Sequence, residues 1–189
     1  MEDPALAGAK KKARVDGRTI IFIDESGLSE RPTRIKTWAP KGCTPVLQYS
    51  FNWSQLSLIA GVTFWRFYFR FFRGSIRSPQ LVEFLKALSA QIKTKLLIIW
   101  DGLPAHRSRL VRDYVESLDS HIVLERLPGY APEPNPVEYL VGYAKQLELA
   151  NLCTSTIDEV RRYAGRRLKS MQRRPQIISA FWKQAELAI

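Results

Sequence analysis

A run of β-branched and aromatic residues that stops at two acids constrains this chain more than any other feature. Residues 19–23 (TIIFI) are followed directly by Asp24 and Glu25. The run is apolar on both faces, which is typical of a central strand covered on two sides. Such a strand holds an acid rigidly at the edge of a hydrophobic core, although an ordinary loop acid after a strand gives the same local pattern.

The pattern of an acid after an apolar element returns twice. Residues 95–100 (KLLIIW) form a second apolar run that ends at Asp101, and Glu138 falls in the first turn of a helix predicted to begin at Pro136. Hard divalent cations such as Mg²⁺ prefer carboxylate oxygen. We therefore expect Asp24, Asp101 and Glu138 to converge on divalent metal, with the two aspartates on neighbouring strands.

Each acid also has a purely structural explanation. Asp101 can cap the turn that follows it, and Glu138 stands three residues after Asn135, a spacing that fits a capping box equally well. Two further acids compete as ligands. Glu25 should point to the opposite face from the acid before it, because successive strand side chains alternate. Glu133 stands between prolines in an extended loop, which suits a ligand less well.

Charge and composition point to an anionic partner. The 189 residues carry a net charge of +11 with a pI near 9.9, which favours nucleic acid. We expect no membrane partner, because no apolar run approaches the roughly 20 residues that span a bilayer, and residues 1–18 are polar and basic, unlike a signal peptide. Cys43 and Cys153 are far apart without metal-ligand spacing, so free thiols in a reducing, cytoplasmic compartment are expected.

The order of predicted elements indicates a mixed α/β sheet flanked by helices. Residues 1–17 are expected to be a flexible basic arm or linker, and residues 18–189 one catalytic domain. Within a loop at 28–52, two segments (36–39 and 45–49) are weak strand candidates. The remaining elements are predicted strands at 56–63, 65–73, 95–100 and 122–124, and predicted helices at 79–93, 106–118, 136–150, 155–172 and 176–189.

Two basic features are candidates for holding DNA phosphates. Lys145 lies seven residues after Glu138, so a regular helix would put both on one face, about 10 Å apart along the axis. The predicted helix at 155–172 has an apolar stripe opposite a basic one. A solvated surface is the alternative for both features. The expected DNA-binding residues are Lys145, Arg162, Arg166, Lys169, Arg173 and His106.

Three blocks of the sequence resemble the acidic blocks of DDE transposases, and more narrowly those of mariner-like bacterial insertion-sequence transposases. The blocks are residues 22–26 (FIDES), 99–106 (IWDGLPAH) and 127–139 (LPGYAPEPNPVEY). The resemblance implies a ribonuclease-H-like fold with a mixed five-stranded sheet, and a catalytic triad of Asp24, Asp101 and Glu138. It also implies two Mg²⁺ or Mn²⁺ ions, hydrolysis of phosphodiesters at transposon ends, and joining of the freed 3′-hydroxyl to target DNA.

The sequence departs from the family pattern in three places. Gly102 follows the second acid, where Asn is common; Pro134 follows Glu133, where Leu is common; and Val141 stands where a Trp often lies. None of these changes removes an acid of the triad, although together they are compatible with a decayed copy.

The resemblance also implies partners. We expect double-stranded DNA, both transposon ends and target, a homodimer in the active complex, and a helix-turn-helix recognition half that is separate or fused. The expected location is the bacterial cytoplasm, at the nucleoid. The alternatives are a catalytically inactive DNA-binding derivative of such a transposase and another ribonuclease-H-like nuclease.

Overall fold

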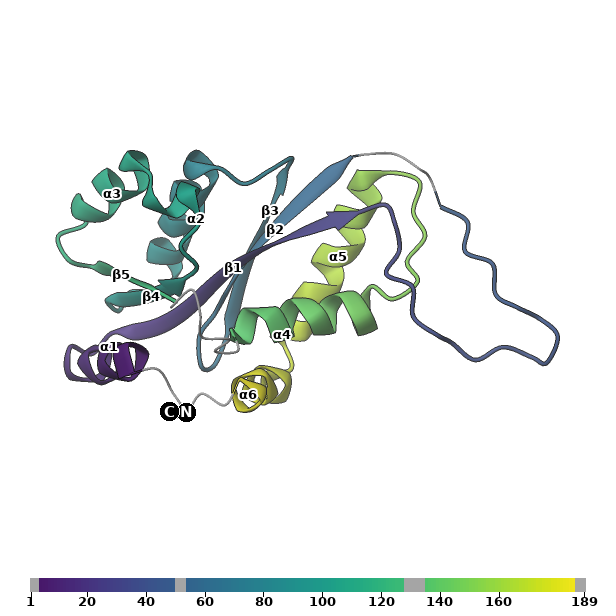
Figure 1. The fold of residues 1–189 in the computed structure, drawn as a ribbon, viewed down its shortest axis with the longest axis horizontal. Helices are drawn as coiled ribbons and strands as arrows, with labels where there is room; N and C mark the ends of the chain where they lie inside the picture. The colour runs from purple at the N-terminus through teal and green to yellow at the C-terminus, as the bar shows by residue number, and fades with distance from the viewer. Residues whose placement is uncertain (1–3, 50–53, 128–134, 186–189) are drawn as a thin grey trace.

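A five-stranded sheet forms the centre of the molecule (Figure 1). The computed structural model describes residues 4–49, 54–127 and 135–185. The strands lie in the order β3-β2-β1-β4-β5. Their bounds are β1 (Thr19–Ser29), β2 (Gln55–Val62), β3 (Phe67–Arg73), β4 (Leu96–Trp100) and β5 (Ile122–Arg126). The mixed five-stranded sheet that the sequence predicts is confirmed, because β1, β2 and β3 pair antiparallel whereas β1, β4 and β5 pair parallel.

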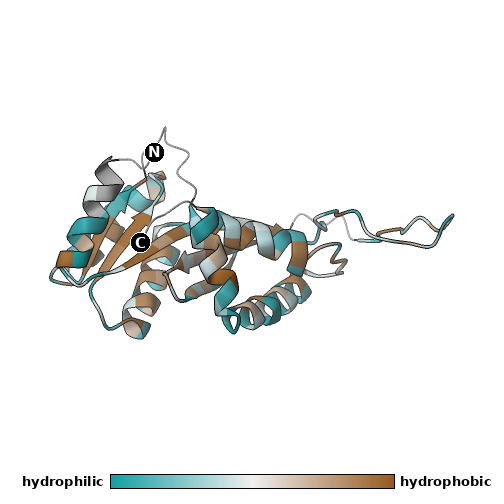
Figure 2. Ribbon diagram, turned by 90° about the horizontal axis from the view of Figure 1, so that it is seen from below, coloured by the Kyte–Doolittle hydropathy of each residue, from teal (hydrophilic) through white to brown (hydrophobic). Residues whose placement is uncertain are grey.

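Helices cover both faces of this sheet (Figure 1). The α-helices are α1 (Pro4–Val15), α2 (Ser78–Gln91), α3 (Arg109–Glu116), α4 (Pro136–Tyr143), α5 (Ile157–Gln172) and α6 (Pro175–Gln184), with a 3-10 turn η1 (Pro104–Arg107) and a π-helical turn η2 (Ala144–Glu148). Helices α2 and α3 bury their apolar side chains on one face, and α4, α5 and α6 bury theirs on the other. Each face therefore has its own hydrophobic core. In Figure 2 the strands are mostly hydrophobic and the outer surfaces of several helices hydrophilic.

The central position of β1 follows from its sequence. Phe22 belongs to the core beneath α4, α5 and α6, whereas Ile21 and Ile23 belong to the core beneath α2 and α3. The prediction of a strand buried on both faces is confirmed. The prediction that the strand stops at Asp24 is wrong, because β1 continues to Ser29. The reason is its second neighbour: antiparallel pairing with β2 extends to Ser29, whereas the parallel pairs with β4 end at Phe22.

The aromatic strand β3 alternates as its sequence predicts, with one exception. Phe67, Phe69 and Phe71 face the core beneath α5 and α6. Trp65, which the sequence places on the same face, is 73% exposed. The strand begins only at Phe67, so its alternation does not extend back to the tryptophan.

Three other segments differ from the sequence predictions. Residues 4–15, expected to be a flexible arm, form α1, and Ala13 is buried in the core; alanine and lysine are good helix formers. Residues 30–49 contain no strand, and they extend away from the sheet (Figure 1). The helix predicted at 106–118 is divided at Ser108, whose extended backbone starts α3 and whose hydroxyl accepts the N–H of Val111.

The predicted stiff loop at 128–134, which includes Glu133, lies outside the described residues. Among the helices that are described, none is long and apolar enough to cross a membrane.

Candidate active site

Asp24 and Asp101 emerge side by side from neighbouring parallel strands. The last parallel pair between β1 and β4 is Phe22 with Ile99, and each aspartate lies two residues beyond its member of that pair. Because side chains alternate along a strand, Asp24 shares the face of Phe22, which is the face covered by α4, whereas Asp101 directly follows the end of β4. The prediction that Asp24 and Asp101 come from adjacent strands is confirmed.

Glu138 approaches from the first turn of α4, which packs on β1 and β2. The helix is capped by Asn135, whose side-chain oxygen accepts the N–H of Val137 at 3.0 Å. Among the hydrogen bonds of the described residues, none involves the Glu138 carboxylate. Glu138 therefore does not complete a capping box, because its carboxylate does not accept the N–H of Asn135 in return.

Electrostatics shows that the acids are close enough to interact. The pKa of Asp24 is raised from 3.8 to about 6, chiefly because the carboxyl is buried, and further because of the negative charges of Asp101, Glu138 and Glu25. One contact opposes the rise, a hydrogen bond from the N–H of Glu25 to Asp24 Oδ1 at 2.7 Å. Within the described part of the chain, no three His, Cys, Asp or Glu side chains are arranged closely enough to hold a metal ion. Shared metal binding by the three acids stays a prediction.

Sequence reasoning missed a second group of side chains beside these acids. The Nε2 atom of His106 lies 3.2 Å from Glu25 Oε1, and its Nδ1 atom lies 2.8 Å from both the backbone oxygen and the carboxylate Oδ1 of Asp101. The imidazole stacks on Trp100, with ring centroids 4.3 Å apart and the planes 8° from parallel. Burial lowers the pKa of His106, but its hydrogen bonds to Glu25 and Asp101 and their charges outweigh burial and raise it.

His106 is therefore an internal residue. Its side chain is 2% exposed, so the ring does not present a surface to DNA. The prediction that His106 binds DNA is therefore wrong. The sequence did contain one signal, since a histidine five residues after a strand-end acid is within reach of that acid. No local pattern indicated Glu25, which is 81 residues away along the chain.

Lys145 also reaches the strand that carries Asp24. Its ammonium donates to Ser26 Oγ at 2.7 Å, and burial lowers its pKa. Ser26 is two residues beyond Asp24, so the two lie on one face of β1. The chain between Glu138 and Lys145 is not a regular α-helix, because α4 gives way to the π-helical turn η2 after Tyr143. Half-burial distinguishes this lysine from a solvated surface residue.

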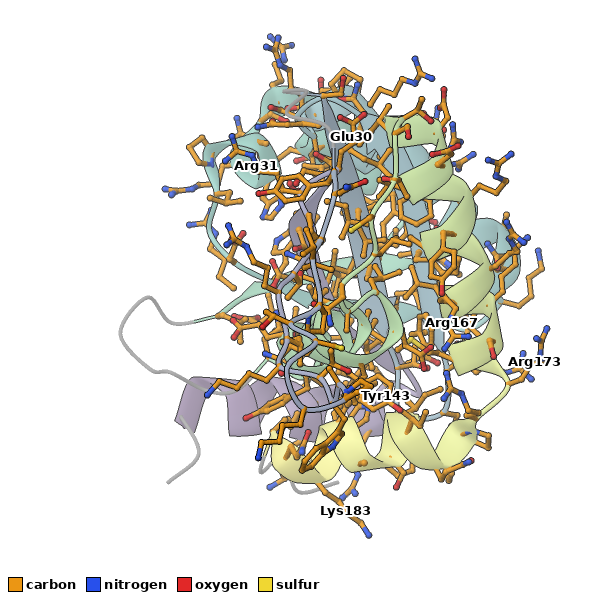
Figure 3. All side chains as sticks on the ribbon, turned by 90° about the vertical axis from the view of Figure 1, so that its right-hand side faces the viewer. Glu30, Arg31, Tyr143, Arg167, Arg173 and Lys183 are labelled. Atoms are coloured by element: carbon orange, nitrogen blue, oxygen red, sulfur yellow. The ribbon has the colours of Figure 1, made fainter. Side chains whose placement is uncertain are left out.

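The basic stripe of α5 has the orientation that the sequence predicts. Val160, Ala164, Leu168 and Met171 are the buried residues of the helix. The opposite stripe is exposed; it consists of Arg162, Arg166, Lys169 and, just past the helix end, Arg173. Arg173 projects outward from the end of α5 (Figure 3).

The sequence matches the profile of a known family over residues 19–161, described as DDE superfamily endonuclease. The match contains β1, β4 and the start of α4, and hence all three acids of the site. The chain belongs to this family. No curated protein matches the sequence significantly.

Solved structures share its fold. A Mos1 transposase paired-end complex with left transposon end matches with a TM-score of 0.66 and 19% identity, over 95% of this chain and 55% of that one. A Mos1 mariner paired end complex with Mn matches with a TM-score of 0.67 and 18% identity, over 96% and 57%. The isolated catalytic domain of Mos1 mariner transposase matches with a TM-score of 0.51 and 13% identity, over 100% and 97%.

These likenesses establish the fold. The sheet and its helices are those of ribonuclease-H-like transposase catalytic domains. The chain spans little more than half the length of the Mos1 chains in the paired-end complexes.

Proposed function

We propose that this chain is the catalytic domain of a metal-dependent DNA transposase. It hydrolyses phosphodiesters at transposon ends and joins the freed 3′-hydroxyl to target DNA. The observation that carries the proposal is that the negative charges of Asp101 and Glu138 contribute to the raised pKa of Asp24. Family membership supports the endonuclease chemistry, and the shared fold supports its use in transposition.

The carboxylates are suitable ligands for Mg²⁺ or Mn²⁺, and we propose that Asp24, Asp101 and Glu138 hold two such ions. Their oxygens have the hard-donor chemistry that these cations prefer. For both aspartates, the hydrogen bonds and ion contacts recorded among the described residues involve only Oδ1 of the carboxylate. When bound, divalent metal supplies Lewis-acid stabilisation of the attacking and leaving oxygens. Mos1 has been solved in paired-end complexes with Mn and with Mg, which supports the choice of metal.

The proposed reaction has two steps at one site. In the first, water attacks the phosphorus, the bond from phosphorus to the 3′ oxygen breaks, and the water proton passes to that oxygen as a free 3′-hydroxyl. In the second, the 3′-hydroxyl oxygen attacks a phosphorus of target DNA, the bond from that phosphorus to a 3′ oxygen of the target breaks, and the hydroxyl proton passes to the leaving oxygen. The chain's own contribution is to hold the acids on packed strands and a helix, where they need no rearrangement between steps.

The basic side chains hold the DNA in this proposal. Lys145, half-buried beside Ser26, binds a phosphate of the strand that enters the site. The exposed basic stripe of α5 binds phosphates of the DNA that lies outside the active site. Contacts of this kind position DNA without reading its sequence. We therefore also propose a helix-turn-helix recognition half, separate or fused, and a homodimer that acts at the nucleoid.

The test is a nicking assay on duplex DNA taken from both sides of the reading frame, where the ends of a transposon would lie. The wild type should nick it in the presence of Mg²⁺ or Mn²⁺ and not with excess chelator. Asp24→Asn, Asp101→Asn and Glu138→Gln should each abolish nicking while the circular dichroism spectrum stays unchanged.

The matched control is Asp113→Asn, an exposed acid of α3 whose carboxylate pairs with Arg109. This variant should nick like the wild type. Nicking that survives in any triad variant would refute the assignment of that acid. A wild type that binds DNA but never nicks it would favour the inactive DNA-binding derivative.

A further inference from the structure

We propose that His106 and Glu25 are positioning residues of the catalytic site: Glu25 orients the imidazole, and the imidazole fixes the carboxylate of Asp101. This inference rests on the proposed function, because it assigns a role relative to the triad. It concerns two residues on the far side of the sheet from Asp24 and Glu138.

The donor arrangement at His106 is defined by its contacts. Nδ1 lies 2.8 Å from two acceptors, the backbone oxygen and Oδ1 of Asp101. An atom that faces two acceptors must carry the hydrogen. The N–H of Leu103 also donates to Asp101 Oδ1, at 3.3 Å. One carboxylate oxygen is therefore held from two sides, which fixes the direction in which the other oxygen points.

Glu25 completes the arrangement from the neighbouring strand. Its Oε1 atom lies 3.2 Å from Nε2 of the same ring. Backbone pairing between β1 and β4 has ended at Phe22 and Ile99, before either aspartate is reached. Beyond that point, the contact of Glu25 with His106 joins β1 to the turn after β4. It takes the place of ladder hydrogen bonds and helps to set the separation of Asp24 and Asp101.

Burial makes the connection stiff. The His106 side chain is 2% exposed, and its ring stacks on Trp100, whereas the Asp101 side chain is 45% exposed. A rigid internal group thus holds a carboxylate that faces outward. Residues that hydrogen-bond to a metal ligand from behind typically change metal affinity or activity 10- to 100-fold when they are replaced.

Two substitutions at one position separate the two contacts. In His106→Asn the amide nitrogen occupies the place of Nδ1, so the donor to Asp101 is kept and the contact with Glu25 is lost. In His106→Gln the amide nitrogen occupies the place of Nε2, so the contact with Glu25 is kept and the donor to Asp101 is lost. A buried histidine that only fills space would tolerate both changes equally.

The experiment measures Mn²⁺ binding to the purified full chain by the loss of the free-ion electron paramagnetic resonance signal, alongside metal-dependent nicking. We expect His106→Gln to weaken Mn²⁺ binding by roughly 10- to 100-fold and to lower the nicking rate similarly. His106→Asn should stay much closer to the wild type. DNA affinity measured without metal should be unchanged in both, because neither variant alters a surface cation.

Glu25→Gln keeps the test decisive if a histidine variant fails to fold. The amide preserves the shape and removes the charge, so Mn²⁺ binding should weaken by less than in His106→Gln. Wild-type Mn²⁺ affinity in both His106→Gln and Glu25→Gln would overturn the inference, and so would equal losses in the asparagine and glutamine variants. Failure of the proposed function has a different signature, since then Asp101→Asn would also leave Mn²⁺ binding unchanged.

Discussion

Asp24→Asn should make the folded domain more stable at neutral pH while it abolishes nicking. The buried carboxylate is destabilised in the folded chain, as the rise of its pKa from 3.8 to about 6 shows. Asparagine removes the charge and keeps an oxygen to accept the N–H of Glu25. One pKa unit corresponds to about 1.4 kcal/mol, so the rise sets an upper limit of about 3 kcal/mol on the gain.

The expected gain is smaller than this limit. Burial of the polar amide also has a cost, which we place at roughly a third to two thirds of the limit. We therefore expect a gain of about 1–2 kcal/mol in the free energy of unfolding. For a domain of this size the melting temperature should rise by about 2–8 °C.

The pH dependence has a definite sign. Between pH 3.8 and about 6 the folded chain retains a proton on Asp24 that the unfolded chain has lost. Below pH 3.8 the carboxyl is neutral in both states and does not destabilise the fold. As pH rises through about 6 the folded carboxyl becomes charged, and this stability is lost. The advantage of Asp24→Asn over the wild type should therefore be complete at neutral pH and should disappear or reverse at about pH 4, where the folded wild type keeps a neutral carboxyl.

The assay is thermal unfolding of both proteins across this pH range, with and without Mg²⁺. Mg²⁺ should raise the melting temperature of the wild type and have little effect on the variant, because a ligand that binds only the folded state stabilises it. Asp113→Asn, on the exposed surface of α3, is the control. An Asp24→Asn variant that is no more stable than the wild type at neutral pH would refute the reasoning. So would a gain of the same size at about pH 4.

Three further predictions follow from other parts of the structure. Reversing the charges of Arg162 and Arg166 should weaken binding to all DNA sequences alike and flatten the dependence of affinity on salt. Reversing two positive charges on α3 should have neither effect. Fluorescence anisotropy measures the affinity and its salt dependence. Trp182→Ala should cost about 3–5 kcal/mol in chemical denaturation, because the ring is buried and its N–H donates to a backbone oxygen at 2.9 Å. Gly61→Val should lower the free energy of unfolding by about 1–3 kcal/mol, because a Cβ atom there would lie 2.8 Å from Ile21 Cδ1. An unchanged free energy of unfolding would show that the Ile21 side chain can move to make room.

Short-range patterns in the sequence predicted much of the fold. The basic and apolar stripes of α5 follow from a repeat of three and four residues, and the helix docks as that repeat requires. The positions of Asp24 and Asp101 follow from two apolar runs, because parallel neighbours bring equivalent ends together. These predictions depended only on local periodicity and on one topological rule.

Other features depend on partners that are distant in the sequence. The length of β1 is set by β2 on its other side, so the apolar run alone could not show where the strand ends. Alternation predicted that Glu25 and Asp24 point to opposite faces of the sheet. It could not show that His106 would lie beside Glu25, with a ring nitrogen directed at Asp101. The π-helical turn that carries Lys145 has no local sequence signal that we can identify.

The alternation of β1 makes its register a condition for activity. Asp24 and Glu25 are consecutive acids that face opposite sides of the sheet, one toward α4 and one toward His106. A shift of one residue in a strand sends every side chain to the other face. A one-residue insertion or deletion within 19–23 would thus leave both acids in the sequence yet turn each to the opposite face of the sheet. Copies of this gene that have lost function in this way would keep the complete acidic motif, so the motif alone is an unreliable sign of an active copy.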